Sequence, residues 1–361
     1  MRILIAAGGT GGHIYPAIAL AQELKSQSPD CEILFLGSEE GLERDLVTKA
    51  GFELKLIKAR ALLRKLSYKA LSAPFICAVG FFQARRVIKE FSPRFLVSFG
   101  GYVSLPAALA AISLGCPLLI HEQNILPGMT NRFLARFADK VFLSFEESKN
   151  YLSFGKSKAC VVGNPVRREI FLADRAEARQ KLGYGPDDLV VMVVGGSQGA
   201  RKINKVLVRA LPRLKEIEGL KLFHIVGKRD SAWINQLLGK EDYPFYQKAD
   251  YLYNMAEVLA AADLVISRAG ATALAEFMAR GLPMILIPFP FSAEGHQKLN
   301  ASWAEEKGAA IVIEDELLSV EELCRQIEKA IKNLKVMSQA AMKLARKDAA
   351  KTVAHWILEY E

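Results

Sequence analysis

The stretch from Ala262 to Ala301 constrains the fold of this 361-residue chain more than any other part of it. Leu264–Ile266 is a short apolar run, as expected of a strand that is buried on both faces. Residues 271–280 are rich in helix formers, and Met284–Ile287 is a second apolar run. This order of strand, turn, helix and strand predicts a βαβ unit, and therefore a parallel sheet.

The turn before that helix is the part of the unit where ligand chemistry is expected. The small residues Ala269, Gly270 and Ala271 let an anion approach the free N–H groups at the start of the helix, so a phosphate or diphosphate is the predicted guest. Glu276 lies about one and a half turns further on, where a carboxylate accepts hydrogen bonds from sugar hydroxyls. Gln297, in the loop after the next strand, reaches the same site. An ordinary βαβ unit with a solvated Glu276 is the alternative, and spacing alone leaves it open.

Length and charge narrow the class of protein. A chain of 361 residues exceeds one typical core, so two domains are expected. The net charge of +9 suits a partner that carries phosphates, or an anionic membrane surface. The chain shows no zinc-finger spacing, aromatic RNP-type strand or basic zipper, so nucleic acid is not expected as a partner.

Cysteine usage and the chain start indicate a cytosolic protein. The cysteines are scattered, odd in number and without a C-x-x-C pair, which is typical of reduced thiols in a core. The chain opens directly on a strand, so no signal peptide is expected, and no apolar run is long enough to cross a bilayer.

The opening strand, Arg2–Ala7, leads into the glycine-rich turn G-G-T-G-G-H at 8–13, with a helix expected from Pro16 to Lys25. Neither the dinucleotide motif G-x-G-x-x-G nor a Walker A loop fits this turn. A tight turn without a ligand is the alternative, but four glycines in five residues favour close approach of the backbone to a ligand.

A basic and apolar segment spans residues 58–89. Arg60, Arg64 and Lys65 precede a stretch, 70–84, that has no charge, and further cations follow it. An apolar segment too short to span, flanked by cations, is what a peripheral membrane contact needs. A core helix with a solvated basic end is the alternative.

The rest of the chain repeats the pattern of strand and glycine turn. A second such turn occupies 100–106, the polar residues H-E-Q-N follow a strand at 121–124, and Gly163–Pro165 breaks the pattern as the expected domain boundary. A strand at 189–194 and the turn G-G-S-Q-G-A at 195–200 then echo the start of the chain. Two Rossmann-like halves are predicted, with their ligand loops at the carboxyl ends of the strands.

Seven motifs occur in the order and spacing of the MurG family of glycosyltransferases, and the resemblance covers essentially the whole chain. They are GGTGGH (8–13), GGYVS-x-P (100–106), HEQN (121–124), GNPVR (163–167), GGSQGA (195–200), SRAGAT-x-x-E (267–276) and HQ-x-x-NA (296–301). The resemblance implies the α/β GT-B fold: two Rossmann-like, doubly wound parallel-sheet domains facing a central cleft. The expected divisions are 1–164 for the lipid acceptor and membrane contact, 165–340 for the donor, and 341–361 as a helix returning to the first domain.

The resemblance also implies the reaction and its partners. GlcNAc would pass from UDP-GlcNAc to the C4 hydroxyl of MurNAc in undecaprenyl-diphosphate-MurNAc-pentapeptide (lipid I), with inversion, to give lipid II for peptidoglycan. The implied partners are UDP-GlcNAc, the undecaprenyl-diphosphate-linked acceptor, an anionic membrane surface and other cell-wall enzymes. The implied location is the cytoplasmic face of the cell membrane, held peripherally.

Site residues carry over from the motifs one by one. In the donor site, Glu276 would bind the ribose hydroxyls, Leu252 would touch uracil, and the helix that starts at Ala271 would bind the diphosphate. The remaining implied donor residues are Thr10, Gly11, Gly12, Asn124, Arg167, Ser197, Thr272, Ala273, Leu274, Ala275 and Gln297. The implied acceptor residues are Gly9, Gly100, Gly101 and Tyr102.

The implied chemistry needs a base on the acceptor hydroxyl and stabilisation of the leaving UDP. His13 is the candidate base, because histidine is the side chain that titrates near neutral pH. Glu122 is its rival, either as the base or as the partner that orients a neighbour, and a structural His13 is the third possibility. No D-x-D motif is present, so the sequence does not call for a metal or another cofactor.

Two departures from the family pattern remain. Leu105 stands where the family usually has Gly, and 292–295 reads S-A-E-G where the family often has consecutive acidic residues. The alternative functions are another GT-B enzyme, with a different nucleotide sugar or a soluble acceptor, and a nucleotide-sugar sensor without turnover.

Overall fold

The computed structural model describes residues 1–39, 41–60, 68–196, 199–239, 241–252 and 254–360. The chain forms two compact units. One comprises Met1–Arg167 together with Arg346–Glu361, and the other comprises Arg168–Ala345. The sequence boundaries were expected at 164/165 and 340/341, whereas the division in the structure falls after Arg167 and again after Ala345.

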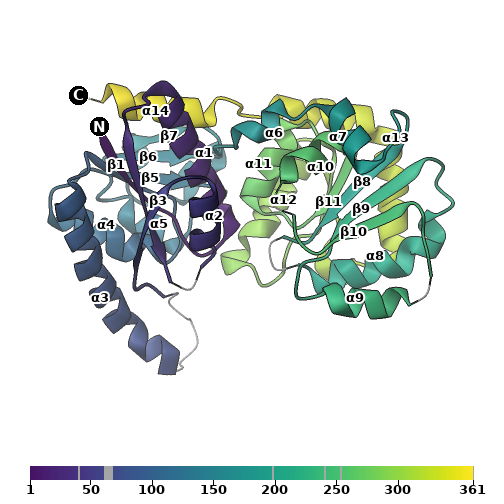
Figure 1. Cartoon of the computed structure of the whole chain (residues 1–361), viewed down its shortest axis with the longest axis horizontal. Helices are drawn as coiled ribbons and strands as arrows, with labels where there is room; N and C mark the ends of the chain where they lie inside the picture. The colour runs from purple at the N-terminus through teal and green to yellow at the C-terminus, as the bar shows by residue number, and fades with distance from the viewer. Residues whose placement is uncertain (40, 61–67, 197–198, 240, 253, 361) are drawn as a thin grey trace. The chain divides into compact units, whose positions relative to one another are not determined.

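The first unit is built on a seven-stranded parallel sheet in the order β3-β2-β1-β4-β5-β6-β7 (Figure 1). Its strands are β1 (Arg2–Ala6), β2 (Glu32–Ser38), β3 (Glu53–Ile57), β4 (Phe95–Ser98), β5 (Leu118–Glu122), β6 (Lys140–Leu143) and β7 (Ala159–Val161). Its α-helices are α1 (Gly11–Gln27), α2 (Glu43–Lys49), α3 (Tyr68–Phe91), α4 (Ser104–Ser113), α5 (Met129–Leu134) and α14 (Ala349–Glu359), with short 3₁₀ helices η1 (Glu146–Tyr151) and η2 (Lys156–Lys158).

The side chains of β1 point alternately to the two faces of the sheet, and all of those inside the strand are apolar, so both faces must be covered. Ile3 and Ile5 lie in one core with residues of α1 and α14, whereas Leu4 and Ala6 lie in the opposite core with residues of α4. Successive side chains of a strand point to opposite faces, so an uninterrupted apolar run requires helices on each side. The apolar strands of the sequence therefore predicted this three-layer arrangement.

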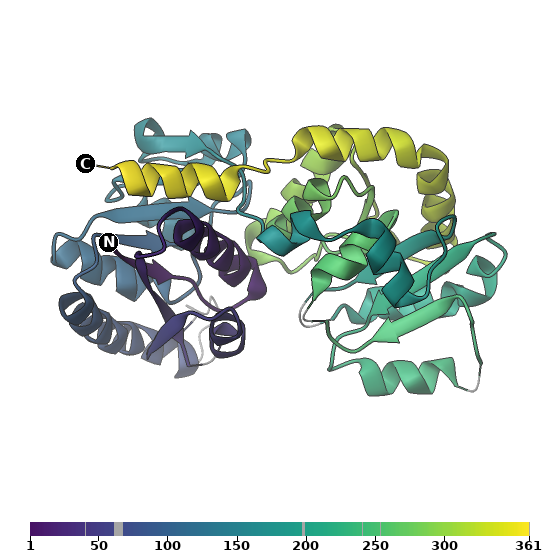
Figure 2. The same ribbon diagram turned by 45° about the horizontal axis from the view of Figure 1, so that its top comes forward.

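The last helix of the chain packs against the first one. Figures 1 and 2 both show α14, in yellow, beside α1, in purple. Val353 and Ile357 of α14 are fully buried, and the Trp356 ring lies against Phe142, with 5.6 Å between centroids. The C-terminal segment thus belongs to the first unit, although it follows the whole of the second unit in sequence.

The second unit has a six-stranded parallel sheet in the order β10-β9-β8-β11-β12-β13. Its strands are β8 (Leu189–Val194), β9 (Leu220–Ile225), β10 (Tyr246–Ala249), β11 (Leu264–Ser267), β12 (Met284–Leu286) and β13 (Ala310–Val312). Its α-helices are α6 (Arg168–Leu172), α7 (Arg175–Leu182), α8 (Arg201–Leu214), α9 (Ser231–Leu238), α10 (Met255–Ala261), α11 (Ala271–Ala279), α12 (His296–Glu306) and α13 (Val320–Leu344), with 3₁₀ helices η3 (Ala293–Gly295) and η4 (Asp315–Leu317).

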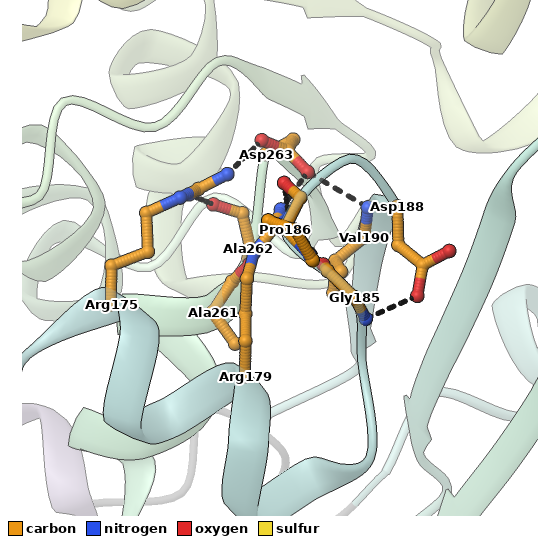
Figure 3. A network of polar contacts seen from close by, with 9 residues as sticks. All are labelled: Arg175, Arg179, Gly185, Pro186, Asp188, Val190, Ala261, Ala262 and Asp263. Carbon is orange, nitrogen blue, oxygen red and sulfur yellow. Dashed lines mark hydrogen bonds and ion pairs between the residues drawn. The ribbon is translucent and has the colours of Figure 1, made fainter.

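A buried ion pair closes the amino-terminal edge of this second sheet (Figure 3). Arg179 of α7 donates to Asp263, just before β11, at 2.6 Å, and it also donates to the carbonyls of Ala261, Gly185 and Pro186. The same Asp263 carboxylate accepts the backbone N–H of Val190 in β8 at 2.8 Å. One side-chain pair therefore fixes α7 to two adjacent strands, on the edge opposite their carboxyl ends.

Three expectations about elements were wrong. The helix expected at 16–25 begins at Gly11, so its first turn contains part of the glycine motif and Pro16 lies inside it. Pro16 is the sixth residue of this helix and, having no N–H, donates no bond to the preceding turn. Gln297 lies in the first turn of α12 and not in a loop. β10 and β13 were not predicted: the sequence of β10, Y-Q-K-A, has no apolar run, and β13 is a run of three apolar residues, A-I-V, in a region expected to be helical.

Candidate active site

Two glycine turns interlock at the carboxyl edge of the first sheet. One follows β1 and the other follows β4, and these strands are neighbours. A Cβ on Gly101 would lie 2.3 Å from the carbonyl oxygen of Gly8, and a Cβ on Gly9 would lie 2.9 Å from the Tyr102 ring. Both glycines have positive φ, 82° and 91°. Any side chain at either position would separate the turns, so the glycines are needed for this close approach.

His13 lies on the first turn of α1, directly above these turns. Its Nδ1 is 3.1 Å from the carbonyl oxygen of Gly8. A carbonyl oxygen only accepts, so Nδ1 carries the proton and the neutral ring has its lone pair on Nε2. A Cβ on Gly100 would lie 3.4 Å from this Nε2 and 3.5 Å from the amide nitrogen of Asn131. The ring is therefore held in the tautomer that a general base requires.

Glu122, the other candidate for the general base, lies buried at the end of β5, where its carboxylate accepts several hydrogen bonds. Its side chain is 2% exposed. One carboxylate oxygen accepts the backbone N–H and the amide of Asn124, at 2.9 and 3.3 Å, and the other accepts from the backbone N–H of Gly128 and the amide of Asn131, at 3.0 and 2.8 Å. Both oxygens are therefore occupied in holding the loop between β5 and α5. This arrangement favours its orienting role over its role as base.

His121 belongs to the packing of the same edge. Its ring is fully buried and stacked on Phe99 at 5.2 Å, its Nε2 donates to the carbonyl of Gly163 at 3.0 Å, and Gln123 donates to its Nδ1 at 3.2 Å. Burial lowers the pKa of His121 to about 4, only partly offset by the hydrogen bond to Gly163. A ring that stays neutral and hydrogen-bonded on both nitrogens has a structural role.

Sequence reasoning missed a buried acid, Glu43, on the first turn of α2. It is 0% exposed, and its Oε1 accepts the backbone N–H of Gly9 at 3.0 Å as well as the N–H and hydroxyl of Ser38 at 3.1 and 3.0 Å. Helical spacing was the available signal. Glu43, Leu46 and Val47 stand at i, i+3 and i+4, and that pattern places the carboxylate on the buried face of the helix.

In the second unit, α11 begins directly after β11. The first helical bond runs from the N–H of Leu274 to the carbonyl of Gly270, at 3.0 Å. The amides of Ala271, Thr272 and Ala273 precede it, in the first turn, where a helix offers its N–H groups no carbonyl of its own. A Cβ on Gly270 would meet nothing within 4 Å, so space adjoins this helix end.

Glu276, the residue predicted to bind ribose, lies further along α11. Glu276 is 6% exposed, so it is a buried carboxylate and the solvated alternative is wrong. Leu274 is fully buried and Ala275 nearly so, so their side chains serve packing. Any contribution of these two residues to a ligand must come from the backbone.

The loop after β12 is anchored by Arg268 of the S-R-A-G turn. This guanidinium donates to the carbonyls of Ile287 and Pro288 at 3.1 and 3.2 Å, and to Asp315 at 2.7 Å. Gln297, at the start of α12, accepts the backbone N–H of Phe289 through its Oε1 at 2.9 Å. That bond orients the amide, because the carbonyl oxygen is engaged and the NH₂ group points away from it.

The other predicted residues divide between the units. Leu252 is half-buried in the second unit, next to the β10–α10 connection, and Ser197 lies outside the described residues. Thr10, Gly11, Gly12, Asn124 and Arg167 belong to the first unit. Arg167 is 6% exposed, and its guanidinium carbon lies 4.0 Å from the centre of the Tyr15 ring.

Two features of the described residues concern metal binding and membranes. No group of three or more His, Cys, Asp or Glu side chains in the described part of the chain is arranged to hold a metal ion. None of the described helices combines the length and apolar character needed to cross a bilayer.

Two family models cover most of the chain. The glycosyltransferase family 28 N-terminal domain matches residues 3–143, and the family 28 C-terminal domain matches residues 190–355. The chain is also similar to two proteins named UDP-N-acetylglucosamine–N-acetylmuramyl-(pentapeptide) pyrophosphoryl-undecaprenol N-acetylglucosamine transferase. That of Desulforamulus reducens is 42% identical over 97% of this chain and 96% of its own length, and that of Moorella thermoacetica is 41% identical over 99% of each.

Solved structures agree with these relatives. The crystal structure of MurG from Acinetobacter baumannii matches 99% of both chains with a TM-score of 0.75 and 30% identity. A UDP complex of MnaA from S. aureus has the same TM-score at 14% identity, covers 99% of this chain and 96% of its own, and shows a shared fold alone. The α/β GT-B fold expected from the sequence is confirmed, and this chain belongs to glycosyltransferase family 28, in the MurG family of N-acetylglucosamine transferases.

Proposed function

We propose that this chain transfers GlcNAc from UDP-GlcNAc to the C4 hydroxyl of MurNAc in undecaprenyl-diphosphate-MurNAc-pentapeptide, with inversion at the anomeric carbon. The observation that carries the proposal is the full-length similarity to proteins named for that transfer. The two sites described above supply the groups that such a reaction needs, one set in each unit.

The second unit is proposed to bind the donor. The diphosphate would lie at the start of α11, where the amides of Ala271, Thr272 and Ala273 and the positive end of the helix dipole face it. Glu276 would accept the ribose hydroxyls and Leu252 would contact uracil. The oriented amide of Gln297 would donate to a GlcNAc hydroxyl. These dipoles are fixed before reaction, so they stabilise the charge that grows on the leaving UDP without reorganising.

The first unit is proposed to bind the acceptor and to activate it. The turns at Gly9, Gly100, Gly101 and Tyr102 would hold the acceptor diphosphate, and His13 would take the proton of the C4 hydroxyl on Nε2. Its Nδ1–H bond to Gly8 supports this role, because the bond leaves the lone pair on the other nitrogen. Glu122 would orient Asn124 and Asn131 around the ring. The contributions of Thr10, Gly11, Gly12, Asn124, Arg167 and Ser197 to the donor site stay predictions.

The proposed location is the cytoplasmic face of the membrane. Helix α3 supports a peripheral contact, because Phe75 and Phe82 are 74% and 67% exposed and stand seven residues apart on one face. Arg86 follows on the same helix with an 81% exposed side chain. Arg64 and Lys65, the cations expected at the start of this segment, lie outside the described residues.

The proposal is tested by turnover of labelled UDP-GlcNAc with a short-chain lipid I analogue. We expect a disaccharide product and UDP in equal amounts, formed at the same rate in EDTA if no metal takes part. His13→Gln should lower kcat about 10²–10⁴-fold and leave the Kd for UDP-GlcNAc unchanged. Binding without release of UDP would instead indicate a sensor. Transfer to a soluble acceptor only, or from another nucleotide sugar, would indicate a different glycosyltransferase.

A further inference from the structure

One peptide group joins a buried acid to the proposed base. The N–H of Gly9 donates to Glu43 Oε1 at 3.0 Å, and the carbonyl of Gly8 accepts from His13 Nδ1 at 3.1 Å. These two groups are the two ends of the same planar unit, the peptide bond between Gly8 and Gly9. We propose that Glu43 is a positioning residue for transfer, which acts on His13 through this single peptide group. This inference rests on the proposed role of His13 as base.

The hydrogen bonds of Glu43 are concentrated on the oxygen that binds this peptide group. Its Oε1 accepts three hydrogen bonds, from Gly9 and twice from Ser38, whereas its Oε2 is buried with no donor among the described residues. Glu43 has no ion-pair partner among the described residues. A buried carboxylate without a cation is costly unless its hydrogen bonds are strong, so its position here calls for a role.

The geometry of the turn leaves the peptide group little freedom. A Cβ on Gly8 would lie 2.7 Å from Glu43 Oε1 and 2.7 Å from Val103, and one on Gly101 would lie 2.3 Å from the oxygen of Gly8. The turn is therefore pressed between α2 on one side and the second glycine turn on the other. If Glu43 releases Gly9, the peptide plane can rotate and the His13 ring loses its fixed acceptor.

The link also acts electrostatically. A carboxylate that accepts the N–H of a peptide increases the negative charge on the carbonyl oxygen at its other end. That oxygen then holds the Nδ1 proton of His13 more strongly and stabilises the imidazolium that forms when Nε2 takes a proton. The result resembles an acid that orients and supports a catalytic histidine, with a peptide group inserted between the two side chains.

The second glycine turn joins the same network. The Ser38 hydroxyl lies 3.0 Å from Glu43 Oε1 and 3.3 Å from the Tyr102 hydroxyl. Ser38 has one proton to give, and it goes to the carboxylate, so Tyr102 is the donor to Ser38. Two titratable groups, Glu43 of α2 and Tyr102 of the second turn, contact the glycine turn that bonds His13, and a third, Glu122, holds Asn131, whose amide lies beside Gly100 as the His13 ring does.

The test measures His13 directly, by NMR of the full chain labelled at its five histidines. Long-range correlations of ring nitrogens with ring protons report the tautomer and the pKa of each ring, and His13→Gln identifies the signals of His13. In Glu43→Gln the amide oxygen can still accept from Gly9, but the negative charge is gone. We expect the His13 pKa to fall by roughly half a unit and the population with a proton on Nδ1 to decrease.

Kinetics give the second readout. Because His13 becomes a weaker base, Glu43→Gln should lower the plateau of kcat about 3–10-fold. The acid limb of the pH profile should move to lower pH, because the pKa of His13 falls. The Kd for UDP-GlcNAc should change much less than kcat, since the residues proposed to bind its diphosphate, ribose and uracil lie in the other unit. Asp45→Asn is the matched control, because Asp45 is exposed on the same helix and is not hydrogen-bonded to the turn among the described residues. It should leave both readouts at wild-type values.

Glu43→Asp tells whether Glu43 acts on His13 through the Gly8–Gly9 peptide group or through the direct electrostatic field of its carboxylate. Aspartate keeps the charge but is one methylene shorter, so it withdraws from the N–H of Gly9. A lowered His13 pKa in this variant supports the peptide route, and a wild-type titration overturns it. Unchanged His13 titration in Glu43→Gln overturns the proposal as a whole. Failure of the wild-type protein to transfer GlcNAc would overturn the proposed function, while the NMR result would still decide whether Glu43 controls His13.

Discussion

Substitution of Glu276 should weaken the binding of the donor, UDP-GlcNAc, and leave that of the acceptor unchanged. We expect Glu276→Ala to raise the KM for UDP-GlcNAc about 10–100-fold, the range for a lost hydrogen bond to a charged group. The effect on kcat should be smaller, because ribose contacts bind the ground state and the transition state alike. Steady-state kinetics at varied donor measure this split. Glu257→Ala, in an exposed pair with Lys181 in the same unit, is the control, and an unchanged KM in Glu276→Ala would remove Glu276 from the donor site.

Two buried histidines should make stability depend on pH. Burial lowers the pKa of His121 to about 4 and that of His224 to about 3, each from 6.5. Below pH 6.5 the unfolded chain binds a proton at each site that the folded chain does not bind, so the free energy of unfolding falls as the pH falls toward these values. The slope approaches about 1.4 kcal/mol per pH unit for each group.

Denaturation at pH 7 and pH 5 measures this effect. His121→Gln should reduce the pH dependence of the first unit, and His224→Gln that of the second. His355 is the control, because its side chain is 64% exposed, and His355→Gln should leave the slope unchanged. A wild-type slope in both buried-site variants would contradict the assignment.

Among the elements, α7 should depend on its ion pair with Asp263. Arg179 has a side chain that is only 4% exposed, and it shares the carboxylate with the N–H of Val190. We expect Asp263→Ala to lower the free energy of unfolding of the second unit by about 3–5 kcal/mol, since it leaves a buried guanidinium without its partner. Urea denaturation followed by Trp233 fluorescence measures it.

The matched control is Lys181→Ala on the same helix. Lys181 also pairs with an acid, Glu257, but its side chain is 60% exposed. Exposed pairs contribute about 0–1 kcal/mol, so this change should have little effect. Equal losses in the two variants would show that burial does not set the strength of these pairs.

For the whole molecule, we expect binding to anionic vesicles that weakens as salt rises. The net charge of +9 attracts the chain to such a surface, and screening reduces the attraction. Replacing Phe75 and Phe82 by Ser should reduce vesicle binding and leave turnover of a soluble acceptor analogue unchanged. Replacing the exposed Val336 of α13 by Ser is the control in the other unit. Equal vesicle binding by all three proteins would contradict the proposed contact of α3.

Local patterns in the sequence predicted the elements well where they are apolar and bounded by glycine. β8 has the predicted limits, because it is a short buried run ended by a turn. The predicted start of α1 was wrong, since the glycines at 11 and 12, which are typical of a loop, form the first turn of the helix. β10 was missed because its four residues are partly exposed and mostly polar, and β13 because a run of three apolar residues is too short to distinguish a strand from part of a buried helix.

The sequence by itself determined the family, the parallel sheets and the positions of the glycine turns, because these depend on residue type and spacing along the chain. Only the tertiary structure decided which groups meet. It brought Glu43 to the peptide group that orients His13, occupied both oxygens of Glu122, buried Glu276, and joined α14 to α1 across the whole length of the chain. The physical reason is that hydrogen bonding and burial depend on distances between segments far apart in sequence, and spacing along the chain does not contain those distances.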